Sequence, residues 1–223
     1  MNVNNRVVAL IYRIIAFCLG FFALVYDFGI LNGQFKVVNF FYFTIISNIF
    51  CVGLFLALVI VTIKDIIKYG IHGASSISPH IKGEIMISIL LTMTVYHFIL
   101  IPYALKLNPY QNLKVIDIIL HYCIPILTLF DWIFFDKKKR FKWYDPFFWI
   151  TGPYLYMIFV FIQARFDIAA RINANISDYI YAFLDINLLG DTAVFLNILS
   201  LTIVFVIIGY IIYGIDRIKL KTD

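Results

Sequence analysis

The chain has few charged residues. Of its 223 residues only 14% are Asp, Glu, Lys or Arg, whereas 63% are hydrophobic. A soluble domain usually carries about 25% charged residues, and without them it lacks the polar surface that a water-soluble globule needs. The deficit excludes an ordinary soluble enzyme, a disordered chain and a nucleic-acid-binding domain. It predicts an integral membrane protein that has membrane lipids, and no nucleic acid, among its partners.

Cysteine is also scarce. Cys18, Cys51 and Cys123 each lie within a long apolar run, which gives neither a disulfide framework nor the spacing of a metal site. We interpret them as small apolar packing residues. The sequence lacks the P-loop, HExxH, GxSxG and GxGxxG motifs as well. It therefore implies no metal and no organic cofactor.

Six apolar stretches are each long enough to cross a bilayer, which takes about 20 residues of helix. They cover about 7–26, 38–63, 84–105, 113–135, 146–164 and 192–215. Backbone polar groups must be satisfied locally in lipid, and these runs lack the alternation of barrel strands. The sequence thus predicts an all-α fold, a single transmembrane domain over 1–223 that is a bundle of six helices. Because Arg13 interrupts the first stretch, we interpret that stretch as an uncleaved span.

Basic residues are distributed unevenly between the two sides of the predicted membrane. Twelve lie on the side of both termini and five on the other side. The twelve are Arg6, Lys64, Lys68, Lys82, Lys137, Lys138, Lys139, Arg140, Lys142, Arg217, Lys219 and Lys221, and the five are Lys36, Lys106, Lys114, Arg165 and Arg171. The positive-inside rule therefore predicts that both termini are cytoplasmic, in a multi-pass protein of the cell (plasma) membrane.

The segment between the fifth and sixth spans, 165–191, mixes charges with the apolar stretch 179–184. It is too short to cross the membrane twice and too apolar to float in water. We predict a lid that lies on the outer surface or dips back into the bundle.

Ionisable side chains within a span are costly and therefore mark candidate functional positions. Five qualify, namely Arg13, His97, Asp117, His121 and Asp131. We expect Arg13 to extend its charged group to the lipid headgroups. Asp131 is expected to act as an interfacial anchor that pairs with Arg13 or with the basic loop.

Thr44 and His121 are predicted at one depth in the outer half of the membrane. They lie about six and eight residues from the outer ends of their spans, which is roughly 9–12 Å. A threonine hydroxyl becomes nucleophilic when a neighbouring base takes its proton, and histidine is the usual base. Asp117, four residues before His121, shares its helix face and is expected to orient the ring. Asn48 or Ser47 is expected to stabilise an oxyanion.

The same residues also have non-catalytic interpretations. The hydroxyls of Thr44 and Ser47 can bond back to helix carbonyls, and His121 can join two helices. His97 reaches a similar depth from the inner side and competes as the base. Spacing alone leaves these alternatives open.

Several motifs resemble those of a bacterial family of six-helix membrane proteins. Residues 41–48 (FYFTIISN) resemble its yFTxxSN signature, and 121–125 (HYCIP) followed by Asp131-Trp132 resemble HYxxPxxxxxDW. Further landmarks follow in order along the chain, namely Asp145-Pro146, Pro153-Tyr154-Leu155-Tyr156, Phe183-Leu184-Asp185, Gly190 and Asn197. Ala182 stands where the family's YPFLD motif has proline.

That family in turn resembles, more distantly, the animal androgen-induced membrane proteins. These are multi-span lipid hydrolases that use an intramembrane threonine and histidine on fatty acid esters of hydroxy fatty acids. The resemblance implies an integral membrane hydrolase of lipid (fatty acid) esters, with Thr44 as nucleophile and His121 as base. A related acyltransferase group uses a cysteine, but Cys123 is two residues from His121 and faces away from it.

Two other functions stay open alongside ester hydrolysis or acyl transfer. One is a small-solute or proton-coupled transporter or channel, in which His97, Asp117 and His121 form a polar path. The other is a non-catalytic structural membrane protein.

Overall fold

The computed structural model describes residues 3–110, 112–171 and 178–218. Within these residues, regular structure is helical apart from one isolated bridge between Asn5 and His72. Six helical spans in the described chain are long and apolar enough to cross a membrane, namely Arg6–Asp27, Phe43–Tyr69, Pro79–Leu107, Val115–Phe135, Asp145–Phe166 and Asp191–Arg217. The predicted all-α bundle is confirmed, and the protein is a multi-pass membrane protein.

Three of the six spans are single helices, and the other three are interrupted. The single helices are α1 (Arg6–Asp27), α2 (Phe43–Tyr69) and α11 (Asp191–Arg217). The third span consists of α3 (Pro79–Val95), the π-helix η3 (Tyr96–Leu100) and α4 (Ile101–Leu107). The fourth consists of α5 (Val115–Ile118), the π-helix η4 (Ile119–Cys123) and α6 (Ile124–Phe135). The fifth consists of α7 (Asp145–Phe148) and α8 (Thr151–Phe166). Short connecting elements are η1 (Ile30–Asn32), η2 (Val37–Phe41), α9 (Ile168–Arg171), η5 (Ala182–Leu184) and α10 (Ile186–Leu189).

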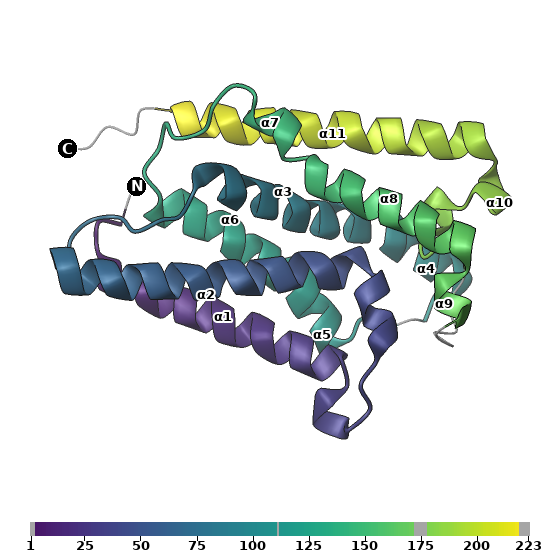
Figure 1. Ribbon diagram of the computed structural model, residues 1–223, viewed down its shortest axis with the longest axis horizontal. Helices are drawn as coiled ribbons and strands as arrows, with labels where there is room; N and C mark the ends of the chain where they lie inside the picture. Colours follow the sequence, from purple (N-terminus) through teal and green to yellow (C-terminus); the bar gives the residue numbers. More distant parts are fainter. Residues whose placement is uncertain (1–2, 111, 172–177, 219–223) are drawn as a thin grey trace.

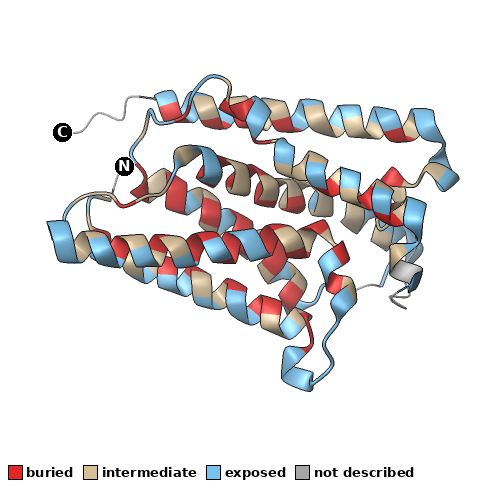
Figure 2. Ribbon diagram, in the orientation of Figure 1, coloured by how far each residue is buried: buried red, intermediate tan, exposed pale blue. Residues whose placement is uncertain are grey.

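The spans run back and forth along one axis (Figure 1). We call the end where α1 begins and α11 ends the near end, and the opposite end, where α1 passes into α2, the far end. Helices α1, α2, α3 and α6 pack against one another, and α8 and α11 pack on α3. The burial colours in Figure 2 follow this arrangement, because the buried positions lie mainly where these helices face each other.

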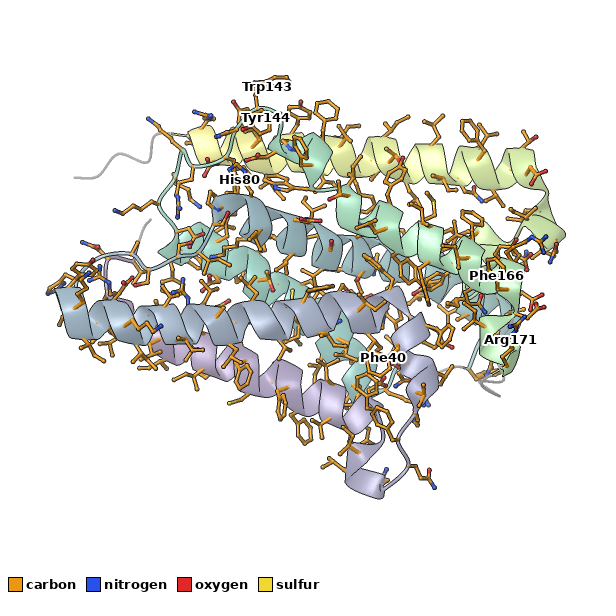
Figure 3. The ribbon with its side chains drawn as sticks, viewed as in Figure 1. Phe40, His80, Trp143, Tyr144, Phe166 and Arg171 are labelled. Atoms are coloured by element: carbon orange, nitrogen blue, oxygen red, sulfur yellow. The ribbon has the colours of Figure 1, made fainter. Side chains whose placement is uncertain are left out.

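The outward faces of the helices are apolar, as a lipid environment requires. Along α11 the exposed side chains include Leu196, Leu199, Ile203, Ile207 and Ile211. Such a continuous exposed apolar face is unusual for a soluble monomer. Aromatic side chains lie toward both ends, with Trp143 and Tyr144 toward the near end and Phe40 and Phe166 toward the far end (Figure 3). Trp and Tyr are enriched at the water boundaries of membrane proteins.

Helix α2 begins at Phe43, five residues after the start that the hydropathy pattern predicts. Val37–Phe41 form a 3₁₀ turn, and Tyr42 is extended, with φ −89° and ψ 130°. Thr44 is therefore the second residue of α2 and not a residue in its second turn. This places its side chain beside backbone groups that the helix leaves unpaired.

A cluster of charged side chains is buried toward the near end. Arg13 Nε lies 2.7 Å from Asp131 Oδ1, and Lys82 Nζ lies 2.5 Å from Asp131 Oδ2 and 2.8 Å from Asp136 Oδ1. Arg13 also donates to the Thr62 hydroxyl over 2.6 Å. We call these five residues the ion cluster; its charged groups join α1, α3 and α6, and Thr62 adds α2.

The ion cluster corrects two predictions. Arg13 does not extend to the headgroups, because its side chain is fully buried against Asp131. The predicted pairing of Asp131 with Arg13 is present, but at 1% exposure it is an interior contact and not an interfacial one. Lys82 is not a loop residue, since α3 begins at Pro79 and carries Lys82 into the bundle. The predicted basic excess on the side of the termini is smaller by this one residue.

We expect Lys82→Met to destabilise the protein by about 3–5 kcal/mol, because it leaves Asp136 buried without its close cation. The measurement is thermal unfolding of the purified protein in detergent. Lys64→Met is the matched control, since Lys64 is exposed near the end of α2. Equal melting temperatures for Lys82→Met and the control would contradict the structural role of the cluster.

Candidate active site

Two π-helices lie within the spans, and each is followed two residues later by a proline. Pro102 follows η3 and Pro125 follows η4. A proline ring clashes with the carbonyl four residues earlier and offers no N–H to it. The chain responds by widening one turn, so that the N–H of Ile101 bonds to the Tyr96 carbonyl and that of Ile124 to the Ile119 carbonyl. Such π-turns are rare and are frequent at functional sites.

The two π-helices contact each other through aromatic side chains. The rings of Tyr96 and His121 stack with their centres 3.6 Å apart and their planes 15° from parallel. Beside them, His97 Nδ1 lies 2.9 Å from the Tyr122 hydroxyl oxygen. The stack leaves the His121 ring little freedom to rotate.

The structure brings Thr44 and His121 together. Thr44 Oγ1 lies 3.2 Å from His121 Nε2, within hydrogen-bond reach. The two residues come from different spans, with Thr44 in the first turn of α2 and His121 in the centre of η4. His121 is buried, and Thr44 is half-buried.

A backbone carbonyl determines which nitrogen of His121 carries the proton. His121 Nδ1 lies 2.9 Å from the carbonyl oxygen of Asp117, and a carbonyl can only accept a hydrogen bond. Nδ1 is therefore the protonated nitrogen of the neutral ring. Nε2 is left with a lone pair, which accepts the hydrogen bond of the Thr44 hydroxyl. This is the state in which a histidine can act as a base.

The Asp117 carboxylate does not make the expected contact with the imidazole. One of its oxygens accepts from the backbone N–H of Lys114 over 3.2 Å. Asp117 is the third residue of α5, where a carboxylate is close to the unpaired N–H groups of the helix start. The residue therefore orients His121 through its main chain and not through its side chain.

Asn48 and Ser47 lie near Thr44 but are committed to other partners. Asn48 Nδ2 donates to the carbonyls of Thr44, over 2.7 Å, and Leu120, over 3.1 Å. Ser47 Oγ lies 3.1 Å from the Thr44 carbonyl and 2.8 Å from the Thr92 hydroxyl. One helical turn separates Asn48 from Thr44, so its amide reaches the Thr44 carbonyl and not the hydroxyl. The structure thus does not give either residue the free donor that an oxyanion needs.

The remaining candidates lie apart from the Thr44–His121 pair. His97 is exposed and contacts Tyr122, so it does not compete for the Thr44 hydroxyl. Cys123 is a free, half-buried thiol, and Arg13 and Asp131 belong to the ion cluster. Among the described residues, no group of three or more His, Cys, Asp or Glu side chains converges in the manner of a metal site.

Thr44 is one of the residues that line an apolar cavity between α3, α8 and α11. Its lining residues are Phe43, Thr44, Leu91, Thr92, Val95, Leu100, Ile150, Pro153, Tyr154, Tyr156, Met157, Tyr181, Phe183, Leu184, Ile198, Leu201, Thr202 and Phe205. We call it the Thr44 cavity. Its volume is ≈ 100 Å³, which is below the roughly 300–1,000 Å³ of pockets that enclose a drug-sized ligand. Its lining includes hydroxyl groups but no charged side chain among the described residues.

The segment predicted as a lid packs on the far end of the bundle in its described part. Tyr181 and Leu184 are buried in a cluster with Phe43 and Tyr156. Residues 172–177 of the predicted lid lie outside the described residues. The sequence interpretation missed Tyr96 and Tyr181 as parts of this site. Pro102 and Pro125 are the signal that could have located the two π-turns and hence Tyr96.

Comparisons of the chain with protein-family models, with characterised proteins and with solved structures found no match. The motif resemblance therefore stays a prediction.

We expect nitrogen NMR of histidine-labelled protein to show His121 protonated at Nδ1 and bare at Nε2. Replacing Thr44 with valine removes the donor and should shift the Nε2 resonance while Nδ1 keeps its proton. His97, which does not contact Thr44, serves as the internal control and should not change. A proton on Nε2 in the wild-type protein would contradict the assignment.

Proposed function

We propose that this protein is an integral membrane hydrolase of lipid (fatty acid) esters, with Thr44 as nucleophile and His121 as base. The observation that carries the proposal is the 3.2 Å contact between His121 Nε2 and the hydroxyl of Thr44, which lines the Thr44 cavity. The resemblance to the androgen-induced proteins assigns the same roles to the same two residues. The proposal places the protein in the plasma membrane with cytoplasmic termini, so that the far end faces outward.

The reaction follows from the two side chains. Thr44 Oγ1 attacks the ester carbonyl carbon while its proton passes to His121 Nε2. The tetrahedral intermediate collapses, the C–O bond to the alcohol breaks, and the imidazolium gives its proton to the departing alkoxide. Water then attacks the acyl-threonine with His121 again as base and releases the fatty acid. If a second alcohol replaces water, the same intermediate gives acyl transfer.

The Thr44 cavity supports an apolar acyl substrate. An acyl chain buried there exchanges lipid for protein contacts, and the lining offers no charge that would favour a polar solute. Because the substrate dissolves in the same membrane, it can reach the site by lateral diffusion. Because the Asp117 carbonyl keeps the proton of the neutral ring on Nδ1, Nε2 needs no further proton transfer before the attack.

We expect the wild-type protein to react covalently with a lipid-like fluorophosphonate, and Thr44→Ala and His121→Ala to lose this labelling. Thr44→Ser should keep it, because a hydroxyl remains beside Nε2. Ser47→Ala is the matched control for a neighbouring hydroxyl and should label as the wild type does. Labelling and melting temperature are measured on the same purified samples.

Labelling that survives Thr44→Ala would overturn the nucleophile. A folded wild-type protein that neither labels nor hydrolyses acyl esters would favour the transport or structural alternatives.

We also expect Asp117→Asn to keep hydrolysis within a few-fold of wild type, because the backbone carbonyl that holds the ring is unchanged. In hydrolases whose histidine is held by a carboxylate, the same substitution lowers kcat about 10⁴-fold. The measurement is hydrolysis of an acyl ester, with His121→Ala as the inactive reference. A fall in the hydrolysis rate of a hundredfold or more would show that the Asp117 carboxylate, and not its carbonyl, orients His121.

A further inference from the structure

Acyl transfer through Thr44 creates a negatively charged oxygen that needs hydrogen-bond donors, and this requirement rests on the proposed function. The two residues that the sequence offers for it, Asn48 and Ser47, direct their polar groups to carbonyls and to Thr92. Other donors close to Thr44 Oγ1 must therefore meet the requirement.

The start of α2 supplies two such donors. The N–H groups of Ile45 and Ile46 both donate to the Tyr42 carbonyl, over 3.1 and 3.2 Å. The N–H groups of Phe43 and Thr44 make no hydrogen bond to a backbone carbonyl within the part of the chain that the structure describes, and both face the Tyr181 hydroxyl oxygen. The Tyr42 side chain does not cap the helix. Because α2 is 27 residues long, its start also carries the positive end of a helix dipole.

Tyr181 adds a third donor from the lid segment. Its side chain is only 9% exposed and lines the Thr44 cavity. Its hydroxyl lies within reach of the Thr44 side chain, the Tyr156 hydroxyl and the backbone N–H groups of Phe43 and Thr44. The neighbouring hydroxyl of Tyr156 donates to the Phe41 carbonyl over 2.7 Å and is therefore not free. Burial raises the pKa of Tyr181 to about 12, so the hydroxyl keeps its proton at neutral pH.

We propose that the N–H groups of Phe43 and Thr44 and the hydroxyl of Tyr181 form the oxyanion-binding site of this enzyme. The ester carbonyl oxygen takes the place of the Tyr181 hydroxyl oxygen in front of the two N–H groups. Its developing charge accepts their hydrogen bonds and that of the Tyr181 hydroxyl as Thr44 Oγ1 attacks. Tyr181 is a catalytic residue in this arrangement, because it touches the reacting oxygen and keeps its proton throughout. The lid segment thus completes the site that α2 and η4 begin.

The test compares Tyr181→Phe with Tyr179→Phe, which removes a hydroxyl two positions away in the same segment. Hydrolysis of a long-chain nitrophenyl ester gives kcat and KM separately. We expect kcat of Tyr181→Phe to fall about 10²–10³-fold, the effect of losing one oxyanion donor. KM should stay within a few-fold, and Tyr179→Phe should behave as the wild type.

A second pair of variants tests the backbone donor and does not depend on the folding of Tyr181→Phe. Phe43→Pro removes the N–H at the first position of α2, where proline fits a helix, and the extended Tyr42 before it suits a residue preceding proline. Phe43→Ala loses the same ring but keeps the N–H. We expect kcat of Phe43→Pro to be at least tenfold below that of Phe43→Ala.

The outcomes separate the two proposals. If the wild type hydrolyses esters and Thr44→Ala does not, an unchanged kcat in Tyr181→Phe overturns the oxyanion site alone. A change in KM without a change in kcat also overturns the oxyanion site, because it shows that Tyr181 contributes to substrate binding and not to the chemical step. Equal kcat values for Phe43→Pro and Phe43→Ala overturn the backbone donor. A folded wild-type protein without hydrolysis or labelling overturns both proposals.

Discussion

The absence of water around the bundle is the constraint on which the rest of the structure depends. In hydrocarbon each polar group inside the protein needs a partner within the protein. The ion cluster shows this most directly, because Arg13 and Lys82 are buried against Asp131 and Asp136 and so join three spans, while the bond from Arg13 to Thr62 adds α2. Asn48 does the same on a smaller scale, since its amide links α2 to the Leu120 carbonyl. Polar groups that stay unpaired under this constraint are few and therefore informative.

The candidate site is located where local chain chemistry breaks helical regularity. Pro102 and Pro125 each widen one turn, and the two widened turns place Tyr96 against His121. The late start of α2 adds the second half of the site, since it leaves the Phe43 and Thr44 N–H groups without backbone partners beside the Thr44 hydroxyl. Regular helices would have satisfied these groups internally and left no reactive arrangement.

Much of the fold could be predicted from the sequence, because hydropathy and length are read along one segment at a time. The six spans follow from them, and matching depths in two spans correctly indicated that Thr44 and His121 are neighbours. Side-chain partners within the bundle were predicted less well. Asp117 shares a helix face with His121, yet its carboxylate turns to the start of α5 and its carbonyl holds the ring. Spacing along a helix predicts which face a side chain lies on, but it does not predict which of the polar groups near that face the side chain bonds to.

The sequence by itself determined the membrane class of the protein, its helical spans and the few polar residues at depth, because the scarcity of charge and the apolar runs are local properties. Only the tertiary structure decided that Arg13 is buried, that the Asn48 amide nitrogen bonds to two carbonyls and that Tyr181 meets the start of α2. These contacts join segments far apart in the chain. They depend on the rotation and depth of each helix against its neighbours, which are set by packing across the whole bundle.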